Sequence, residues 1–383
     1  MPKIYLDYAS TTPVDPKVME AMKTYFKKDF GNPSSIHSFG QKAIAAIDDA
    51  RQKVASFLGC ELDEVIFTGS ATEANNLAIF GLIKKGDHII TTQIEHHAIL
   101  EPCQKLEKEG VEVTYLPVDK DGLVKVSDVE KAIKLNTILV SIMYANNEIG
   151  TIQPIAEIGE LLKARKNKIY FHTDAVQAAN YLDCDVKKLG VDLLTLSGHK
   201  IYGPKGVGAL FVKKGILLNP LIYGGGQEQG RRSGTENVPA IVGLGAAIEE
   251  TQNPKIKINI IRIRQFRDKL IKTILKIVSD SKLNGSPIQR LPNNINVTID
   301  GAEGEAMVIA LDQKGIAVST GSACSAKSLE PSHVLLALGL SHEEAHGSLR
   351  ITLGRYTTQE EITKFLKVLP QVIQRLRQIS GYK

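Results

Sequence analysis

The chain has 383 residues, of which 43% are hydrophobic and 23% charged, the composition of an ordinary folded protein of about two domains. Its 47 Lys and Arg residues against 42 Asp and Glu residues leave a net charge of +5, too small to indicate nucleic-acid binding. No apolar run is long enough to span a bilayer and the start, MPKIYLDYASTTP, lacks the layout of a signal peptide, so no membrane partner is expected.

Predicted strands and helices alternate along the first two thirds of the chain. In chain order they are a strand at 4–6, helices at 16–28 and 37–58, a strand at 64–68, a helix to about 84, a strand at 88–92, a helix at 98–109, a strand at 111–116, a helix at 126–134, a strand at 137–144, a helix at 155–166, and strands at 169–173, 191–196 and 207–212. Such alternation is typical of a mostly parallel sheet covered on both faces. We therefore predict a large α/β domain over residues 16–253.

The pattern changes after Asn253-Pro254. It predicts a long basic amphipathic helix at 255–278, a strand at 295–299, a helix at 303–314, a strand at 316–319, a loop at 320–331, a helix at 332–338, a strand at 349–353 and a helix at 359–379. These mixed elements indicate a smaller α+β domain, formed by residues 1–15 together with 254–383.

The most informative stretch is LTLSGHKIYGPKGVGAL, residues 194–210, in which a predicted strand ends at Lys200. In α/β sheets, ligands bind at the ends of strands. A partly desolvated lysine there can act as a nucleophilic amine and form a Schiff base. Most lysines are instead solvated surface residues, so Lys200 becomes a candidate only through the motifs that accompany it.

Two other predicted strands end in polar motifs. TGSATE, residues 68–73, leads into a helix, and its small residues and helix N-terminus suit a phosphate, with the hydroxyls of Ser70 and Thr72 as further donors. An ordinary capped helix start is the alternative. Asp174 ends the strand YFHTD, where a partly buried carboxylate needs a partner, such as a protonated pyridine nitrogen. A helix N-cap is the alternative for this aspartate.

A histidine and an arginine extend the set. His96 follows the strand at 88–92, where a neutral imidazole could stack on a flat ring and move protons. Adjacent His97 would point the opposite way on a strand, so the pair is not expected to bind one metal ion. Arg350, on the strand at 349–353, could bind a carboxylate through two parallel hydrogen bonds or form an ordinary surface ion pair.

The four cysteines, Cys60, Cys103, Cys184 and Cys324, include no CxxC pair, which favours free thiols in a reducing cytoplasm. Cys324 lies in TGSACSA, a loop of small residues that suits a thiolate reaching into a site and out again. A buried, inert cysteine is the alternative, and it fits Cys103 better.

The motif HEEAH, residues 342–346, matches the H-E-x-x-H pattern of zinc hydrolases. That pattern needs a continuous helix to bring both histidines to one face. Gly339 and Gly347 bracket the motif and a predicted strand follows at once, so we expect neither that helix nor a resident metal.

Together, and in this order, the motifs resemble those of the cysteine desulfurases of the NifS/IscS type, in the class V aminotransferase branch of the fold-type-I pyridoxal phosphate enzymes. The resemblance covers nearly the whole chain and is carried by YLDY (5–8), TTP (11–13), GNPSS (31–35), ANNEIG (145–150), SGHK (197–200), RSGT (232–235), SACS (322–325) and LEPSH (329–333). The last two are similar to the group of desulfurases with a longer cysteine loop.

The resemblance implies that pyridoxal 5'-phosphate (PLP) is the cofactor and that Lys200 holds it as a Schiff base. The residues implied to bind the cofactor or the substrate are Ala71, Thr72, Ser197 and His199 with Thr235 of the partner subunit for the phosphate, Asp174 for the pyridine nitrogen, Gln177 for the ring hydroxyl, His96 stacked on the ring, Asn147 for cofactor and substrate, and Arg350 and Asn32 for the substrate. Cys324 would be the nucleophile.

The implied reaction removes sulfur from L-cysteine, leaving L-alanine and a persulfide on Cys324, with Lys200 and His96 moving the protons. The resemblance also implies a homodimer and an acceptor for the sulfur, such as an iron–sulfur scaffold protein, with Cys324 as a transient iron–sulfur ligand. The chain ends at Gly381-Tyr382-Lys383, without the tail that helps many relatives to dock the scaffold.

Several alternatives stay open at this point. The nearest is an aminotransferase or a selenocysteine lyase on the same fold, and a transaminase would have no need of Cys324. A non-catalytic sulfur-trafficking partner and a zinc hydrolase are more remote, because the first would not need Lys200 and Asp174 and the second would need a metal.

Overall fold

The computed structural model describes residues 3–321 and 330–382. A seven-stranded sheet has the order β2-β8-β7-β6-β5-β3-β4. Its strands are β2 (Val65–Thr68), β3 (His88–Thr92), β4 (Glu112–Leu116), β5 (Thr137–Ser141), β6 (Tyr170–Asp174), β7 (Leu193–Ser197) and β8 (Gly208–Val212). Within this sheet only β8 runs opposite to the other strands, which confirms the mostly parallel α/β fold.

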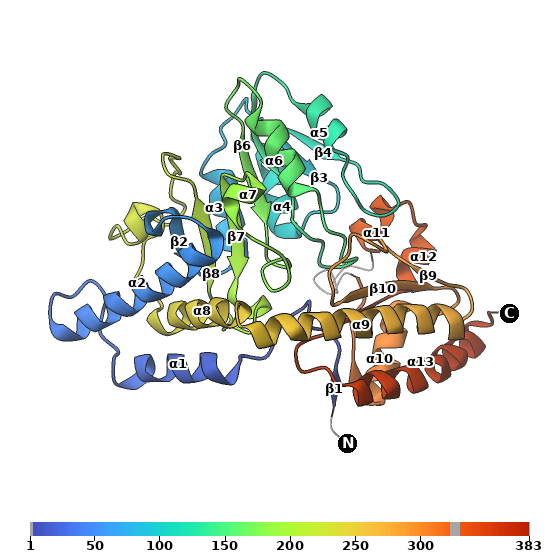
Figure 1. Ribbon diagram of the computed structural model, residues 1–383. Helices are drawn as coiled ribbons and strands as arrows, with labels where there is room; N and C mark the ends of the chain where they lie inside the picture. The colour runs from blue at the N-terminus through green and yellow to red at the C-terminus, as the bar shows by residue number, and fades with distance from the viewer. Residues whose placement is uncertain (1–2, 322–329, 383) are drawn as a thin grey trace.

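Helices cover both faces of this sheet, as Figure 1 shows. On one face lie α2 (Ser38–Leu58), α5 (Val126–Ala132), α6 (Ile155–Lys163), α7 (Val186–Leu189) and α8 (Val238–Thr251), with α1 (Pro16–Lys27) packed against α8. The other face is covered by α3 (Ala71–Phe80) and α4 (His97–Glu107). Strands such as β7 and β8 are buried on both faces, which explains their near-continuous apolar sequences.

Helix α8 was not among the predicted elements. Its sequence, VPAIVGLGAAIEET, is apolar on all sides and therefore shows no amphipathic period. The helix packs closely against α2, because a Cβ at Gly245 would come within 2.8 Å of the Cα of Ala50. Burial between α1, α2 and the sheet therefore stabilises this helix, and its sequence has no helical period of apolar residues that would have predicted it.

A smaller unit stands at the other end of the molecule. Strand β1 (Ile4–Tyr5) pairs with β11 (Ile316–Ala317), while β9 (Ser281–Leu283), β10 (Asn294–Ile299) and β12 (Ser348–Thr352) form an antiparallel sheet in the order β12-β10-β9. The helices of this unit are α9 (Pro254–Ile277), α10 (Gly304–Gln313), α11 (His333–Ala337), α12 (His342–His346) and α13 (Gln359–Ser380). It has its own apolar core, from Ile4 to Ile373.

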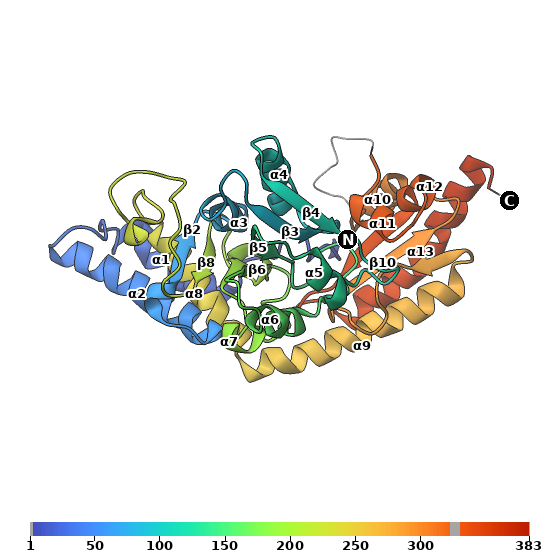
Figure 2. The same ribbon diagram turned by 90° about the horizontal axis from the view of Figure 1, so that it is seen from above.

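Helix α9 runs along both units, starting beside α8 and continuing under β9 and β10 (Figures 1 and 2). The two separate apolar cores support a domain boundary near Asn253, and we propose the division of residues 16–253 from 1–15 plus 254–383 on that ground. Among the described residues, no helix has both the length and the apolar character needed to cross a membrane.

The HEEAH motif was predicted not to form a helix, and this prediction is wrong. The residues form the five-residue helix α12, capped by Ser341 through a hydrogen bond from the Glu344 amide. The Ser341–Glu344 capping box is local and overrides the flanking glycines. In the described part of the chain no cluster of His, Cys, Asp and Glu has metal-site geometry.

Candidate active site

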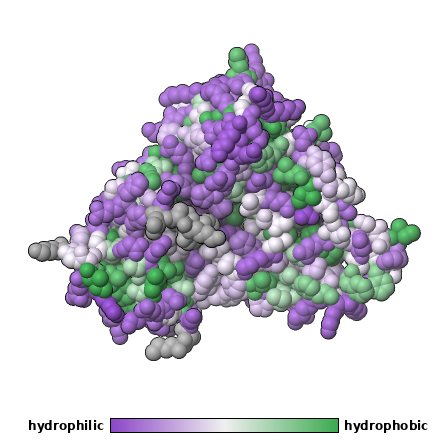
Figure 3. Space-filling model, turned by 180° about the vertical axis from the view of Figure 1, so that it is seen from behind, coloured by the Kyte–Doolittle hydropathy of each residue, from purple (hydrophilic) through white to green (hydrophobic). Residues whose placement is uncertain are grey.

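A cavity of about 270 Å³ lies where the ends of β6 and β7, the starts of α3 and α4, the residues after β5 and strand β12 meet. Figure 3 shows the face opposite to that of Figure 1: it is largely hydrophilic and hollowed near its centre. The predicted site residues that line the cavity are Ala71, Thr72, His96, Asn147, Asp174, Gln177, Ser197, His199, Lys200 and Arg350. Residues far apart in the sequence are thus brought together as the strand-end argument expected.

Two predicted residues that the structure describes, Asn32 and Thr235, are not brought together with this set. Asn32 lies in the exposed turn between α1 and α2, where its side chain accepts a hydrogen bond from the Ser34 amide at 2.9 Å. Thr235 is exposed in the loop before α8. Neither residue lines the cavity of its own chain. Cys324 lies outside the described residues.

Lys200 occupies the short 3-10 helix Gly198–Lys200 that follows β7. Its ammonium group donates to the carbonyl oxygens of Ala9, at 2.6 Å, and Ser10, at 2.8 Å. The side-chain amide of Gln177 donates to the same Ala9 oxygen at 3.0 Å. The N-terminal segment therefore holds the lysine and the glutamine at one wall of the cavity.

The N-terminus of α3 opens on the cavity. Ser70 is the N-cap, since its hydroxyl accepts from the Glu73 amide at 3.1 Å, so the capped-helix interpretation is confirmed. The first-turn amides of a helix have no partner within the helix, and the helix dipole favours an anion there. Gly208 allows this turn to approach β8, because a Cβ at that position would lie 2.7 Å from the Ser70 carbonyl carbon.

Asp174 ends β6 and is only 7% exposed. One carboxylate oxygen accepts from the side-chain amide of Asn75 on α3, at 2.7 Å, and the other from the Val176 amide, at 3.0 Å. No helix begins after Asp174, so the N-cap interpretation is wrong and the aspartate closes a turn instead. Sequence analysis missed Asn75, because nothing in its local pattern marks it as the partner of Asp174.

His96 is the N-cap of α4, and its Nδ1 accepts from the Ala98 amide at 3.0 Å. This bond places the proton of the neutral ring on Nε2. Burial lowers the pKa of His96, the charge of Lys200 lowers it further, and Asp174 opposes the change. His97 belongs to the same helix start and not to a strand, so the opposite-face argument does not apply to this pair.

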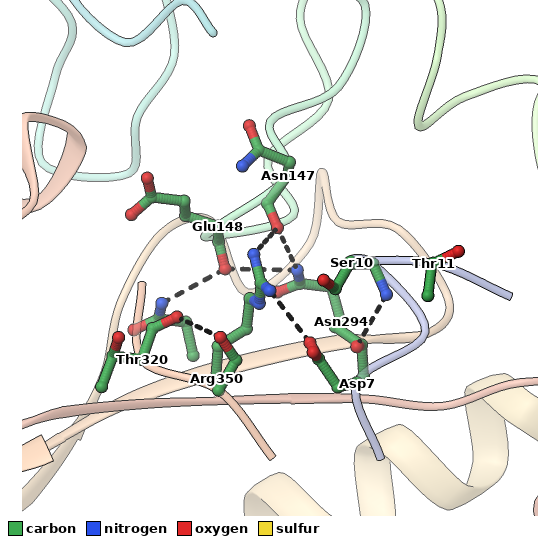
Figure 4. Close-up of polar contacts among 12 residues, drawn as sticks. Asp7, Ser10, Thr11, Asn147, Glu148, Asn294, Thr320 and Arg350 are labelled. Carbon is green, nitrogen blue, oxygen red and sulfur yellow. Dashed lines mark hydrogen bonds and ion pairs between the residues drawn. The ribbon is translucent and has the colours of Figure 1, made fainter. Parts of the chain in front are cut away.

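Arg350 is 3% exposed, so the surface ion-pair interpretation is wrong. Its guanidinium donates to the Asp7 carboxylate at 3.0 Å and to the Asn147 carbonyl oxygen at 3.2 Å, as Figure 4 shows. Its Nε is buried and has no partner among the described residues. Arg350 also lines the cavity, where a buried guanidinium is suited to a carboxylate ligand.

Two buried carboxyl groups beside the site were not assigned a role from the sequence. Burial raises the pKa of Glu95 to about 8, although donors from Thr92 and the Met143 amide oppose the rise. Burial likewise raises the pKa of Glu148, which lines the cavity, to about 7. Their position in the loops that follow strands β3 and β5 was the available signal.

The donors around the cavity fit PLP. An aromatic phosphate needs an anion site, which the α3 N-terminus, Ser197 and His199 offer, and a carboxylate for its ring nitrogen, which Asp174 offers. Lys200 supplies an amine on the same cavity. Burial and neighbouring lysines lower the pKa of His199 to about 4, so its ring is neutral near pH 7 and acts by hydrogen bonding.

Comparison with known proteins agrees with this fit. The family model for aminotransferase class V matches residues 4–365. The chain is 54% identical to the cysteine desulfurase IscS of Dictyoglomus turgidum, over 100% of this chain and 97% of the relative, and 53% identical to that of Methanosarcina thermophila, over 98% and 93%.

Solved structures show the same similarity. A NifS-like protein superposes with a TM-score of 0.91 at 37% identity, covering 97% of this chain and 100% of that one. A structure described as SspA in complex with cysteine superposes with a TM-score of 0.80 at 42% identity, covering 93% of this chain and 100% of that one.

Proposed function

The chain belongs to the class V aminotransferases and, among them, to the cysteine desulfurases, and from this membership we propose how its residues remove sulfur from L-cysteine. The enzyme uses PLP and yields L-alanine. The observation that carries the assignment of roles is that one cavity joins Lys200, Asp174, the start of α3 and Arg350.

The first group of roles concerns the cofactor. When bound, PLP supplies an aldehyde carbon for amines and a ring that withdraws electrons from the substrate. Lys200 is the amine that holds it, and the start of α3 with Ser197 and His199 binds its phosphate. Asp174 keeps a proton on the ring nitrogen, and the hydrogen bond from Asn75 holds this carboxylate in place.

The second group concerns the substrate. Arg350 and Asn147 bind the carboxylate of L-cysteine, because both line the cavity and the guanidinium is a buried cation there. Lys200 and His96 move the protons, His96 through its Nε2. Because Nδ1 accepts the capping hydrogen bond from the Ala98 amide, Nε2 is the ring nitrogen that is left to exchange a proton.

Cys324 is the nucleophile. Its thiolate attacks the substrate sulfur, so that a sulfur–sulfur bond forms while the bond between sulfur and the substrate Cβ breaks. A proton then takes the place of sulfur on Cβ, and the products are alanine and a Cys324 persulfide. The persulfide sulfur passes to an acceptor, for which an iron–sulfur scaffold protein is the proposed class.

The two predicted residues outside the cavity support a homodimer. Thr235 and Asn32 are exposed and line no part of the cavity of their own chain, so their roles require the cavity of a second copy. A cytoplasmic location is proposed because the reaction needs a reduced Cys324, and the described cysteines are free thiols.

The first experiment is an absorbance spectrum of the purified protein before and after borohydride, with the Lys200→Ala variant beside it. We expect a visible band that borohydride bleaches and the variant lacks, and release of sulfide and alanine from L-cysteine with a reductant. A protein that cannot be reconstituted with PLP would refute the cofactor assignment.

The Cys324→Ala variant separates the alternatives. We expect it to bind L-cysteine, as seen in its spectrum, and to release no sulfide. Continued turnover of L-cysteine would instead favour an aminotransferase, and a strong preference for selenocysteine in competition would favour a lyase.

A further inference from the structure

Glu148 occupies an unusual place at the cavity wall. It is 4% exposed, and one of its carboxylate oxygens accepts a hydrogen bond from the Ser332 hydroxyl at 2.5 Å. Ser332 is in turn the N-cap of α11, where its oxygen accepts from the Leu335 amide at 3.3 Å. The carboxylate therefore fixes the residue with which the chain enters α11.

The same oxygen of Glu148 also packs against Gly321. A Cβ at position 321 would lie 2.6 Å from this oxygen and 3.5 Å from the Ser332 Cβ, so a larger residue there would have to displace the carboxylate. Gly321 and Ser332 stand on either side of residues 322–331, the segment that carries Cys324. A single buried carboxylate thus touches the chain on both sides of the predicted nucleophile.

Hydrogen bonds to neighbouring asparagine side chains fix the backbone of Glu148. Its carbonyl oxygen accepts from the side-chain amides of Asn294 and Asn296, at 3.2 Å each, and its amide donates to the Asn146 side chain at 2.8 Å. In Figure 4 its carboxylate points away from the guanidinium of Arg350. The carboxylate therefore takes its hydrogen bond from Ser332, while the neighbouring Arg350 acts on it through its charge.

The chain before Gly321 is anchored as well. The amide of Ser319 donates to the Arg350 carbonyl oxygen at 3.1 Å, and the Arg350 amide donates to the Ser319 carbonyl oxygen at 2.7 Å. After the segment, the His333 ring donates to the Glu95 carbonyl oxygen at 2.9 Å. Glu148 is the group that joins these two anchored stretches to each other.

We propose that Glu148 is a positioning residue, whose carboxylate clamps Gly321 and Ser332 together and so fixes the two chain positions between which the Cys324 segment extends. This inference rests on the proposed role of Cys324. Fixing the ends of a loop reduces the conformations open to it, and a misplacement of about 1 Å can cost roughly a hundredfold in rate. Attack on the substrate sulfur depends on this placement, whereas binding of L-cysteine at Arg350 does not.

Matched variants test the clamp. Glu148→Gln keeps the shape and loses the charged acceptor, and Ser332→Ala removes the donor. Ser341→Ala is the control, because Ser341 caps the equally short helix α12 by the same kind of bond, to the Glu344 amide at 3.2 Å, without contacting Glu148. Ser332→Thr restores the hydroxyl.

We expect Glu148→Gln and Ser332→Ala to lower kcat for sulfide release by about tenfold or more, while the L-cysteine concentration that half-saturates the spectral change moves by less than about threefold. Ser341→Ala and Ser332→Thr should keep kcat within about threefold of the wild type. Equal losses in Ser332→Ala and Ser341→Ala would show a general effect of lost helix capping and overturn the proposal.

A second readout does not depend on turnover. Lys327 lies inside the segment, so brief trypsin treatment of the native holoenzyme can release a 1–327 fragment, measured by intact mass. We expect this fragment to form faster in Glu148→Gln and Ser332→Ala than in the wild type and Ser341→Ala; equal rates would overturn the clamp. If Cys324→Ala still releases sulfide, the proposed role of Cys324 is refuted. The rate of trypsin cleavage then still tests whether Glu148 holds the two ends of the segment.

Discussion

Replacing Glu95 by glutamine tests the cost of a buried carboxylate beside the site. Glu95 is 1% exposed and accepts from the Thr92 hydroxyl at 2.7 Å and from the Met143 amide at 3.0 and 3.1 Å. Burial dominates these donors and raises its pKa from 4.5 to about 8. The folded protein therefore binds a proton at pH 6 that the unfolded chain has released.

The sign of the pH dependence follows from this order of pKa values. The stability contributed by protonated Glu95 is fully present below pH 4.5 and is lost as the pH rises to about 8. Between pH 6 and pH 8.5 the wild type should lose about 2.5 kcal/mol from this group, and Glu95→Gln should lose none of it. The variant should thus gain about 2.5 kcal/mol relative to the wild type over this range.

Urea unfolding of both proteins at the two pH values measures this difference, and taking variant minus wild type at each pH cancels the titrations that the proteins share. Glu305→Gln, at an exposed carboxylate in the first turn of α10, is the control and should give the same difference at both pH values. A Glu95→Gln difference that does not change with pH would refute the assignment of a raised pKa.

Three further substitutions have expected outcomes. Asn75→Ala should weaken PLP binding about tenfold, measured by titration of the apoprotein, because Asp174 loses the donor 2.7 Å away; unchanged affinity would contradict this role. Gly208→Ala should lower the unfolding temperature and PLP content together, since its Cβ would meet backbone at the start of α3; a fully loaded variant would count against that contact. Asp7→Asn should destabilise the protein by about 3 kcal/mol in urea unfolding, because it leaves Arg350 buried without its counter-charge, and a loss below about 1 kcal/mol would show that water compensates.

Much of the fold could be predicted because its signals are local. The strand His88–Thr92 and the stop of α2 at Gly59, which has a φ of 67°, are as the pattern of residues indicates. The apolar helix α8 and the one-turn helix α12 escaped prediction. Burial decides the first and a capping box decides the second, and neither leaves a periodic signal.

For the candidate site, too, the sequence predicts some features and only the structure shows the others. The sequence by itself determined which groups could do chemistry at strand ends, Lys200 and Asp174 above all, because a parallel sheet brings its strand ends to one edge. Only the tertiary structure decided their partners: Asn75 for Asp174, Asp7 for Arg350, and the two chain positions that Glu148 joins. These contacts join residues far apart in the sequence, and a hydrogen bond depends on distance in space, which a linear pattern does not contain.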